Sequence, residues 1–140
     1  HPPREILEAG DTIRRLFPDP MTEAKRYYDQ LGYFPIMHIM AFRNEVVEQE
    51  PNLPRAVISM WESAKRTAAL YYEDPGYSEI AFARNAMEHQ EEMFGADIWP
   101  SGFAANRDNI ARFIEYSADQ GLISTAYAPE RLFHASVLDT

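Results

Sequence analysis

The sequence predicts an α/β protein that is mostly helical and carries one strong strand. Two observations lead to this class. Proline and glycine divide the 140 residues into short segments, most of which repeat their apolar residues at helical spacing. Residues 34–42 (FPIMHIMAF) instead form a nearly continuous apolar run, as expected of a strand covered on both faces. With 46% hydrophobic and 25% charged residues, the composition is that of a folded chain rather than a disordered one.

The expected helices begin at capping residues or prolines and end at glycine or proline. In chain order they cover residues 4–9, 22–31, 45–49, a long segment that follows Asn52, then 78–94, 106–120 and 130–133. The apolar residues of the long helix share one face, which we expect to be buried. They are Leu53, Val57, Met60, Trp61, Ala64 and Ala68. The corresponding face of the helix over 106–120 contains Ile110, Phe113, Ile114 and Ser117.

The strand over residues 34–42 needs neighbours, because a single strand cannot satisfy its own backbone hydrogen-bonding groups. No other segment of the chain has the pattern of a strand. Two explanations remain open: these residues are part of a longer α/β protein, or the strand pairs with another molecule.

Charge and composition exclude several classes of function. The net charge is −9, and the 11 Arg and 2 Lys are scattered along the chain, so we expect no nucleic-acid binding. No cysteine is present, which excludes disulfide scaffolds, thiolate zinc sites and cysteine nucleophiles. No run of 18 apolar residues predicts a membrane span. Because the chain starts at His1 rather than Met, we expect its natural start to lie elsewhere.

His38 is the titratable residue of the apolar run. It is either a core histidine bonded to backbone groups or a general acid or base beside a cleft. Arg14 and Arg15 stand next to each other in an irregular segment, where alternation sends their side chains to opposite faces. Either they pair with Asp11 or Asp19 on the surface, or one of them binds a ligand carboxylate.

A second candidate site is the loop that carries Trp99, which leads into the helix expected to begin at Asn106. Backbone N–H groups at a helix N-terminus suit an anion, and Arg107 lies in the first turn. Asn106 is either the N-cap of this helix or a ligand-binding residue. The acidic segment around His89 has no metal-ligand spacing and is interpreted as a solvated helix face. We therefore predict no metal site.

The motifs together resemble the C-terminal part of 4,5-dihydroxyphthalate decarboxylases and their relatives. The similar segments, in order, are IRRLFPD (13–19), G-x-FPIMH (32–38), EQEPNLPRAVISMWESAKR (48–66), FGADIWPSGFAANRDNIARFIEYSADQGL (94–122) and APERLF (128–133). The PIMH segment and the WP-x-G-x-x-x-NR segment are the most specific of these.

This resemblance implies a fold like that of the type 2 periplasmic binding proteins, in which two α/β lobes enclose a ligand cleft. Residues 1–33 would form the end of the second lobe and the crossover segment. Residues 34–140 would form the return strand and the helices that complete the first lobe. The N-terminal part of the protein, with the rest of the sheet, would be missing from this chain.

The resemblance also implies decarboxylation of a dihydroxylated aromatic dicarboxylic acid similar to 4,5-dihydroxyphthalate, without an organic cofactor and in the cytoplasm. His38 would deliver the proton, Arg14, Arg15 or Arg107 would hold the remaining carboxylate, and Trp99 would pack on the ring. Asn106 would complete the binding residues. One alternative is a solute-binding protein for an anionic small molecule that feeds a transporter, which would be periplasmic or lipid-anchored. A protein of thiamin-precursor metabolism is a third alternative.

Overall fold

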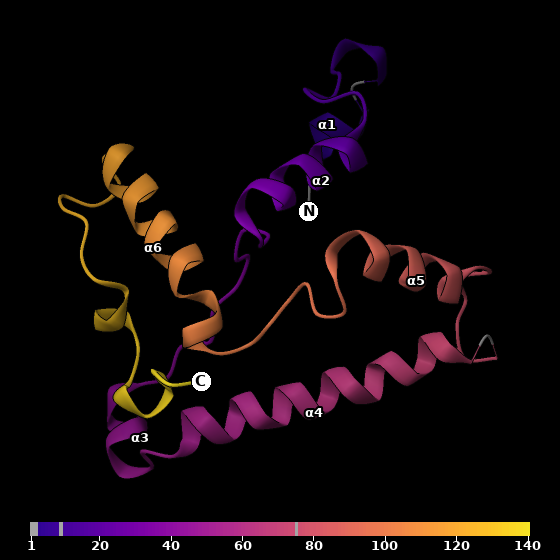
Figure 1. Ribbon diagram of the computed structural model, residues 1–140. Helices are drawn as coiled ribbons and strands as arrows, with labels where there is room; N and C mark the ends of the chain where they lie inside the picture. Colours follow the sequence, from indigo (N-terminus) through magenta and orange to yellow (C-terminus); the bar gives the residue numbers. More distant parts are fainter. Residues whose placement is uncertain (1–2, 9, 75) are drawn as a thin grey trace. The chain divides into compact units, whose positions relative to one another are not determined.

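The computed structural model describes residues 3–8, 10–74 and 76–140. It divides into two units, His1–Gly32 and Tyr33–Thr140 (Figure 1). The division falls beside the expected boundary after residue 33, while the assignment of the two parts to lobes stays a prediction.

The first unit contains α1 (Arg4–Glu8), the 3-10 helix η1 (Gly10–Thr12) and α2 (Pro20–Leu31). The helix expected over residues 4–9 is confirmed as far as Glu8, and Ala9 lies outside the described residues. None of the twelve residues of α2 is buried.

Local contacts at both ends define α2. The carboxylate of Asp19 accepts the backbone N–H groups of Met21 (3.0 Å) and Thr22 (3.2 Å) and the hydroxyl of Thr22 (2.6 Å). The hydrogen bonds from Thr22, with that from Met21, lower the pKa of Asp19. At the other end Gly32 adopts φ 74°, and its N–H bonds to the carbonyl of Tyr28 at 2.7 Å. This end of the helix was predicted from Gly32 and is confirmed.

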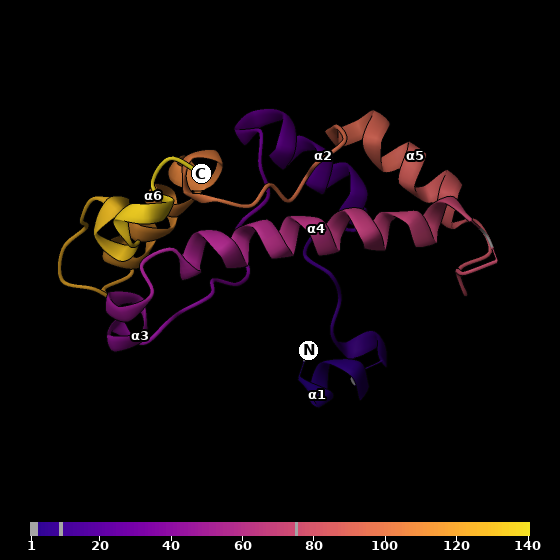
Figure 2. The same cartoon turned by 90° about the horizontal axis from the view of Figure 1, so that it is seen from below.

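The second unit is also helical wherever its described residues are regular. It contains α3 (Asn44–Gln49), α4 (Leu53–Glu73), α5 (Ala83–Phe94), α6 (Phe103–Asp119), η2 (Pro129–Leu132) and η3 (Ala135–Val137). After the turn that follows α4, α5 returns alongside it (Figure 2). The expected helices are present, but α5 begins five residues later than predicted and α6 begins three residues earlier. The segment predicted as a helix over 130–133 is a 3-10 helix.

The predicted strand over residues 34–42, and with it the α/β class, is wrong for the described part of the chain. These residues form no regular structure there, and every regular element of the described residues is helical. The start of the segment is bonded to a side chain rather than to a strand. Asn109 of α6 donates to the carbonyl of Phe34 (2.7 Å) and accepts the N–H of Ile36 (3.4 Å). An apolar run alone does not specify a sheet, because a strand exists only where a second backbone pairs with it.

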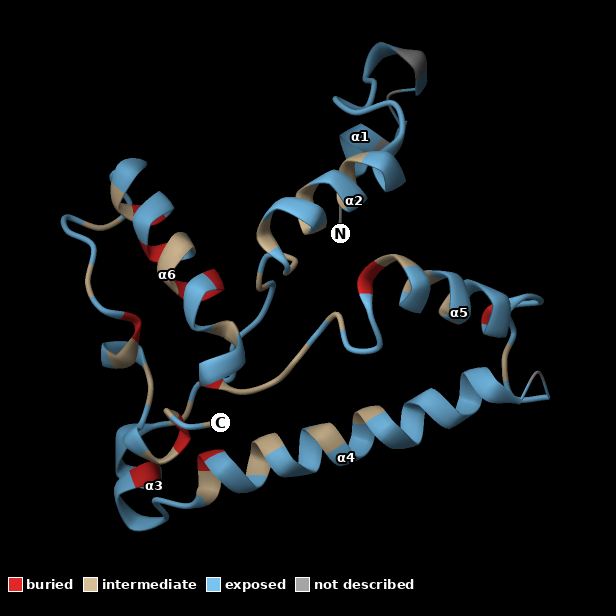
Figure 3. Cartoon of the chain, in the orientation of Figure 1, coloured by how far each residue is buried: buried red, intermediate tan, exposed pale blue. Residues whose placement is uncertain are grey.

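The predicted buried face of α4 is also wrong over most of its length. Leu53 and Val57 are half-buried, but Met60 and Trp61 are 65% and 56% exposed. Ala64 and Ala68 are exposed as well. Only Pro54 is buried among the residues of this helix (Figure 3). The helical spacing was read correctly, but the surface that would cover it is not supplied by the described residues.

The core of the second unit lies along α6, where Phe103, Ile110 and Ile114 are buried together. Half-buried apolar side chains pack against this cluster: Ile36, Ile123, Tyr127, Phe133 and Leu138. The ring of Phe103 lies 5.1 Å from that of Phe133, measured between centroids. The predicted apolar face of α6 is confirmed for Ile110, Ile114 and Ser117, whereas Phe113 is 65% exposed. The core therefore joins α6 to the segments that precede α3 and follow α6.

Candidate functional site

The loop between α5 and α6 carries Trp99 and is fixed by its own sequence at one end. Asp97 Oδ1 accepts the backbone N–H of Trp99 at 3.1 Å, which closes a short turn. At the other end Gly102, with φ 97°, precedes the first residue of α6. This segment was predicted to be a loop, and that prediction is confirmed.

Two side chains of α4 hold the loop from one side. Lys65 Nζ donates to the carbonyl oxygen of Trp99 (2.7 Å), to both carboxylate oxygens of Asp97 (3.1 and 3.2 Å) and to Glu62 Oε1 (3.1 Å). Glu62 is also hydrogen-bonded to the side chain of Ser101. Because Lys65 has three N–H donors and bonds three groups, its ammonium is fully used in this arrangement.

The same contacts shift the pKa values of this pair. The hydrogen bond with Ser101, followed by the hydrogen bond and charge of Lys65, lowers the pKa of Glu62 below its ordinary value of 4.5. Partial burial acts to lower the pKa of Lys65, but the hydrogen bonds and charges of Glu62 and Asp97 outweigh it, so the pKa of Lys65 is raised. Both groups are therefore charged at neutral pH, and Lys65 anchors the loop rather than supplying a proton.

Asn106 holds the loop from the side of α6. Its Nδ2 donates to the carbonyl oxygens of Pro100 (2.7 Å) and Gly102 (2.9 Å). Because α6 begins at Phe103, Asn106 lies inside the first turn and is not the N-cap. The two predicted roles of this residue were capping and ligand binding; the first is wrong, and the second stays a prediction.

The N-terminus of α6, where an anion was expected, is occupied by Thr140. The N–H of Phe103 donates to Thr140 Oγ1 (3.1 Å), and the N–H of Ala104 donates to the carbonyl oxygen of Thr140 (2.5 Å). A side chain at Gly102 would meet this residue, because a Cβ atom there would lie 2.7 Å from the carbonyl carbon of Thr140. Two backbone donors of this helix end are thus already bonded within the chain.

Arg107 also has a protein partner. Its Nε lies 2.7 Å from Glu130 Oε1. A hydrogen bond from its own backbone N–H, and then the bond with Arg107, lower the pKa of Glu130. The ligand-binding role predicted for Arg107 would require this half-exposed ion pair to exchange partners.

An aromatic cluster borders the loop. The ring of Trp99 lies 5.7 Å from that of Phe34 at a tilt of 36°, and Phe34 contacts Phe94 edge-on at 5.2 Å. Trp99 is 52% exposed, so part of its ring remains accessible. The fixed loop and the fixed Phe34 together present an aromatic surface on which a planar ring can pack.

The structure does not bring the remaining predicted site residues into this cluster. His38 lies farther along the extended segment and is exposed, and no hydrogen bond or ion pair links it to the part of the chain that the structure describes. Arg14 and Arg15 belong to the first unit, where both are exposed. Their predicted roles stay predictions. No group of three His, Asp or Glu side chains forms a metal site among the described residues.

Lys65, Glu62, Phe34 and Asn109 were not predicted as site residues from the sequence. One signal was present for Lys65, which follows Trp61 by four residues and so lies on the apolar face of α4. A charged residue on such a face needs a partner, but its partner Asp97 is 32 residues away in the sequence. Local residue spacing therefore could not predict the pairing of Lys65 with Asp97.

The chain is similar to 4,5-dihydroxyphthalate decarboxylase of Comamonas testosteroni, with 31% identity over 130 residues. The match covers 91% of this chain and 39% of the relative, so the chain spans about two fifths of that protein's length. The predicted resemblance is confirmed by this match. A comparison with protein-family models found no match. None of the described helices combines the length and hydropathy needed to cross a membrane.

Proposed function

We propose that this chain forms part of the substrate site of a decarboxylase that acts on a dihydroxylated aromatic dicarboxylic acid. The observation that carries the proposal is the match to a protein named 4,5-dihydroxyphthalate decarboxylase across 91% of this chain. The accessible ring of Trp99, held by Lys65, Asp97 and Phe34, supports it, because an aromatic substrate needs a fixed apolar surface.

The chemistry requires a proton, an electron sink and a hold on the substrate. A proton adds to the ring carbon that bears the leaving carboxylate, and the hydroxyl para to it stabilises the resulting cation. The carbon–carbon bond then breaks, its electron pair restores the aromatic ring, and CO₂ leaves. The net change replaces CO₂ by a proton, so the reaction consumes one proton and no oxidant or reductant.

In this proposal His38 delivers the proton, because it is an exposed imidazole on the same extended segment as Phe34. Arg14 and Arg15 are exposed and are the better candidates for the second carboxylate. Arg107 would first have to leave Glu130. Trp99 would pack on the ring, and Asn106 would keep the carbonyl groups of the loop in place.

The test uses the whole protein encoded by the reading frame that contains these residues. CO₂ release from 4,5-dihydroxyphthalate is followed for the parent, His38→Ala and Trp99→Ala. We expect His38→Ala to lower kcat by about 10²–10⁴-fold, as for loss of a general acid. We expect Trp99→Ala to act mainly through KM.

A matched control separates these effects from general damage. His89→Ala removes an imidazole that is 69% exposed on α5, and this variant should retain parental turnover. Binding of the substrate without release of CO₂ by the parent would contradict the proposal and favour a solute-binding protein.

A further inference from the structure

The extended segment between α2 and α3 exposes three large apolar side chains within four residues. Met37, Ile39 and Met40 are 75%, 69% and 60% exposed. Single exposed apolar residues are common on protein surfaces, but a contiguous group of this size marks an interaction surface.

The backbone of this segment is open as well. The N–H of Ile36 bonds to Asn109, and the carbonyl of Arg43 accepts the N–H groups of Val46 and Val47. Between these two anchors, no hydrogen bond of the described residues involves the backbone of residues 37–42. The segment is thus fixed at both ends and available along its middle.

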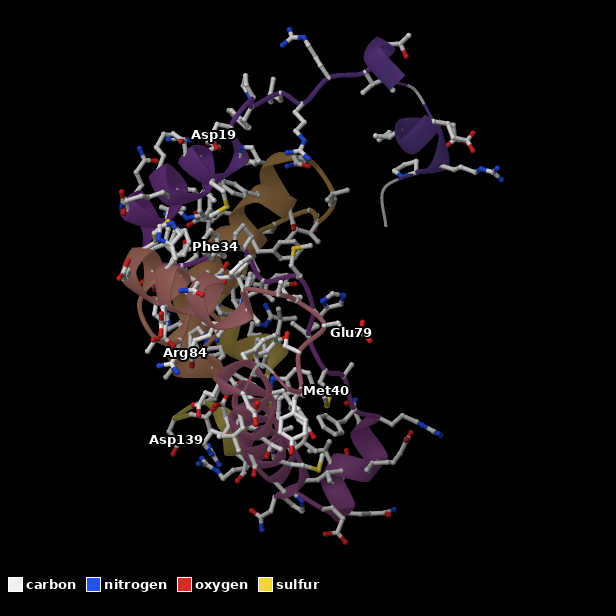
Figure 4. The ribbon with its side chains drawn as sticks, turned by 90° about the vertical axis from the view of Figure 1, so that its right-hand side faces the viewer. Asp19, Phe34, Met40, Glu79, Arg84 and Asp139 are labelled. Carbon is white, nitrogen blue, oxygen red and sulfur yellow. The ribbon has the colours of Figure 1, made fainter. Side chains whose placement is uncertain are left out.

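The neighbouring helix presents a second apolar group. Met60 and Trp61 of α4 follow the helical spacing of a buried face, yet they are 65% and 56% exposed. Figure 4 looks nearly along the axis of α4 and labels Met40 on the extended segment. A pattern that specifies burial, combined with exposure in the structure, indicates a covering surface that the described residues do not supply.

We propose that Met37, Ile39 and Met40, together with Met60 and Trp61, form the docking surface for further polypeptide of the same protein. The occupant is the portion that corresponds to the part of the decarboxylase relative that this chain does not match. More than half of that relative's length has no counterpart here. The inference does not depend on the proposed activity.

The absence of cysteine makes the surface testable with single labels. Met40→Cys is introduced into the 140-residue chain and into the whole protein encoded by the reading frame, and its rate of reaction with a maleimide is measured in each. Met37→Cys provides a second variant on the same surface. Glu92→Cys is the control, because the Glu92 side chain is 79% exposed on α5 and lies outside the proposed surface.

We expect Met40→Cys and Met37→Cys to react at least about tenfold more slowly in the whole protein than in the 140-residue chain, because labelling then requires local opening. The control should react equally in both. Equal rates for the two surface variants would overturn the proposal. It would also be overturned if the 140-residue chain forms a dimer whose own concentration determines the protection, since the occupant would then be a second copy. A reading frame that encodes no further polypeptide would overturn it as well.

Discussion

Helices α2 and α6 are stabilised in opposite ways. α2 has a side-chain cap at Asp19, a left-handed glycine after its last residue and ion pairs between neighbouring turns, but no buried residue. α6 has no side-chain cap from its own N-cap residue, and it buries five of its residues, among them Ile110 and Ile114. The first helix is specified by residues a few positions apart, and the second by residues far away in the sequence.

This difference decides how each helix responds to change. Contacts within one helix stabilise it by a few tenths of a kcal/mol each, and one can be lost without the others. A substitution in α2 should therefore have only a local effect. The contacts of α6 join the extended segment, η2 and the C-terminal residue, so damage there should spread through the second unit. The variants below test that contrast.

Ile114→Ala should have the largest effect, because Ile114 is 2% exposed at the centre of the core. Loss of this side chain removes buried apolar area and leaves a cavity, which costs about 2–5 kcal/mol of the free energy of unfolding. Urea denaturation followed by circular dichroism measures it. The control is Phe113→Ala, one position earlier on the same helix and 65% exposed. Equal losses for the two variants would show that α6 is not packed as described.

Lys65→Met should release the loop that carries Trp99 while leaving the core intact. The lost hydrogen bonds involve charged groups, but the Lys65 side chain is 28% exposed, so we expect a loss of about 1 kcal/mol. Faster hydrogen exchange of the Trp99 backbone N–H, observed by NMR, is the specific measurement. Lys25→Met, which removes an ion pair of α2, should leave that exchange rate unchanged. An unchanged rate in Lys65→Met itself would rule out the anchoring role.

Acid should release the same loop through Glu62. Its pKa is lowered in the folded chain, so its stabilising contribution is complete above its ordinary pKa of 4.5 and is lost as the pH falls through the lower, folded value. After correction for the intrinsic rate, exchange at Trp99 should therefore be independent of Glu62 between pH 7 and pH 5. It should accelerate only once the pH has fallen below the ordinary value of 4.5. Glu62→Gln should remove this acid dependence, whereas Glu115→Gln, on the exposed side of α6, should retain it.

Asp19→Ala should have the smallest effect, confined to the first turn of α2. The alanine variant removes the oxygen that accepts the backbone N–H groups of Met21 and Thr22. Asp19→Asn restores an acceptor oxygen at this position. We expect a slight loss of helical signal for alanine and recovery for asparagine, with the unfolding midpoint of the second unit unchanged. A shift of that midpoint would contradict the separation of local from long-range stabilisation.

The helix ends show which structural features can be predicted from the sequence. Gly32 and Gly95 end α2 and α5 as predicted, because a cap depends on residues within one turn. The start of α6 was missed by three residues because it depends on Thr140, which lies 37 positions from Phe103. The strand was wrong because residues 34–42 have the composition of a paired segment without a described partner.

The candidate site was only partly predictable for the same reason. Trp99 and its loop stand out by aromatic content and by Pro100 and Gly102. The residues that anchor the loop cannot be recognised in the sequence, because Lys65, Asn109 and Phe34 come together only through tertiary contacts. An anion at the start of α6 stays a prediction, and two backbone N–H groups there are bonded to Thr140.

The anchoring of Lys65 has a practical consequence, because the chain has only two lysines and one lies in each unit. Lys25 is half-exposed beside Asp29, whereas Lys65 shares its three protons among three acceptors. An acylating reagent should therefore modify Lys25 at once and Lys65 only when the loop dissociates. Mass spectrometry of the digested protein at successive times would then give the rate of loop opening from the acylation of Lys65, with the acylation of Lys25 as the internal reference.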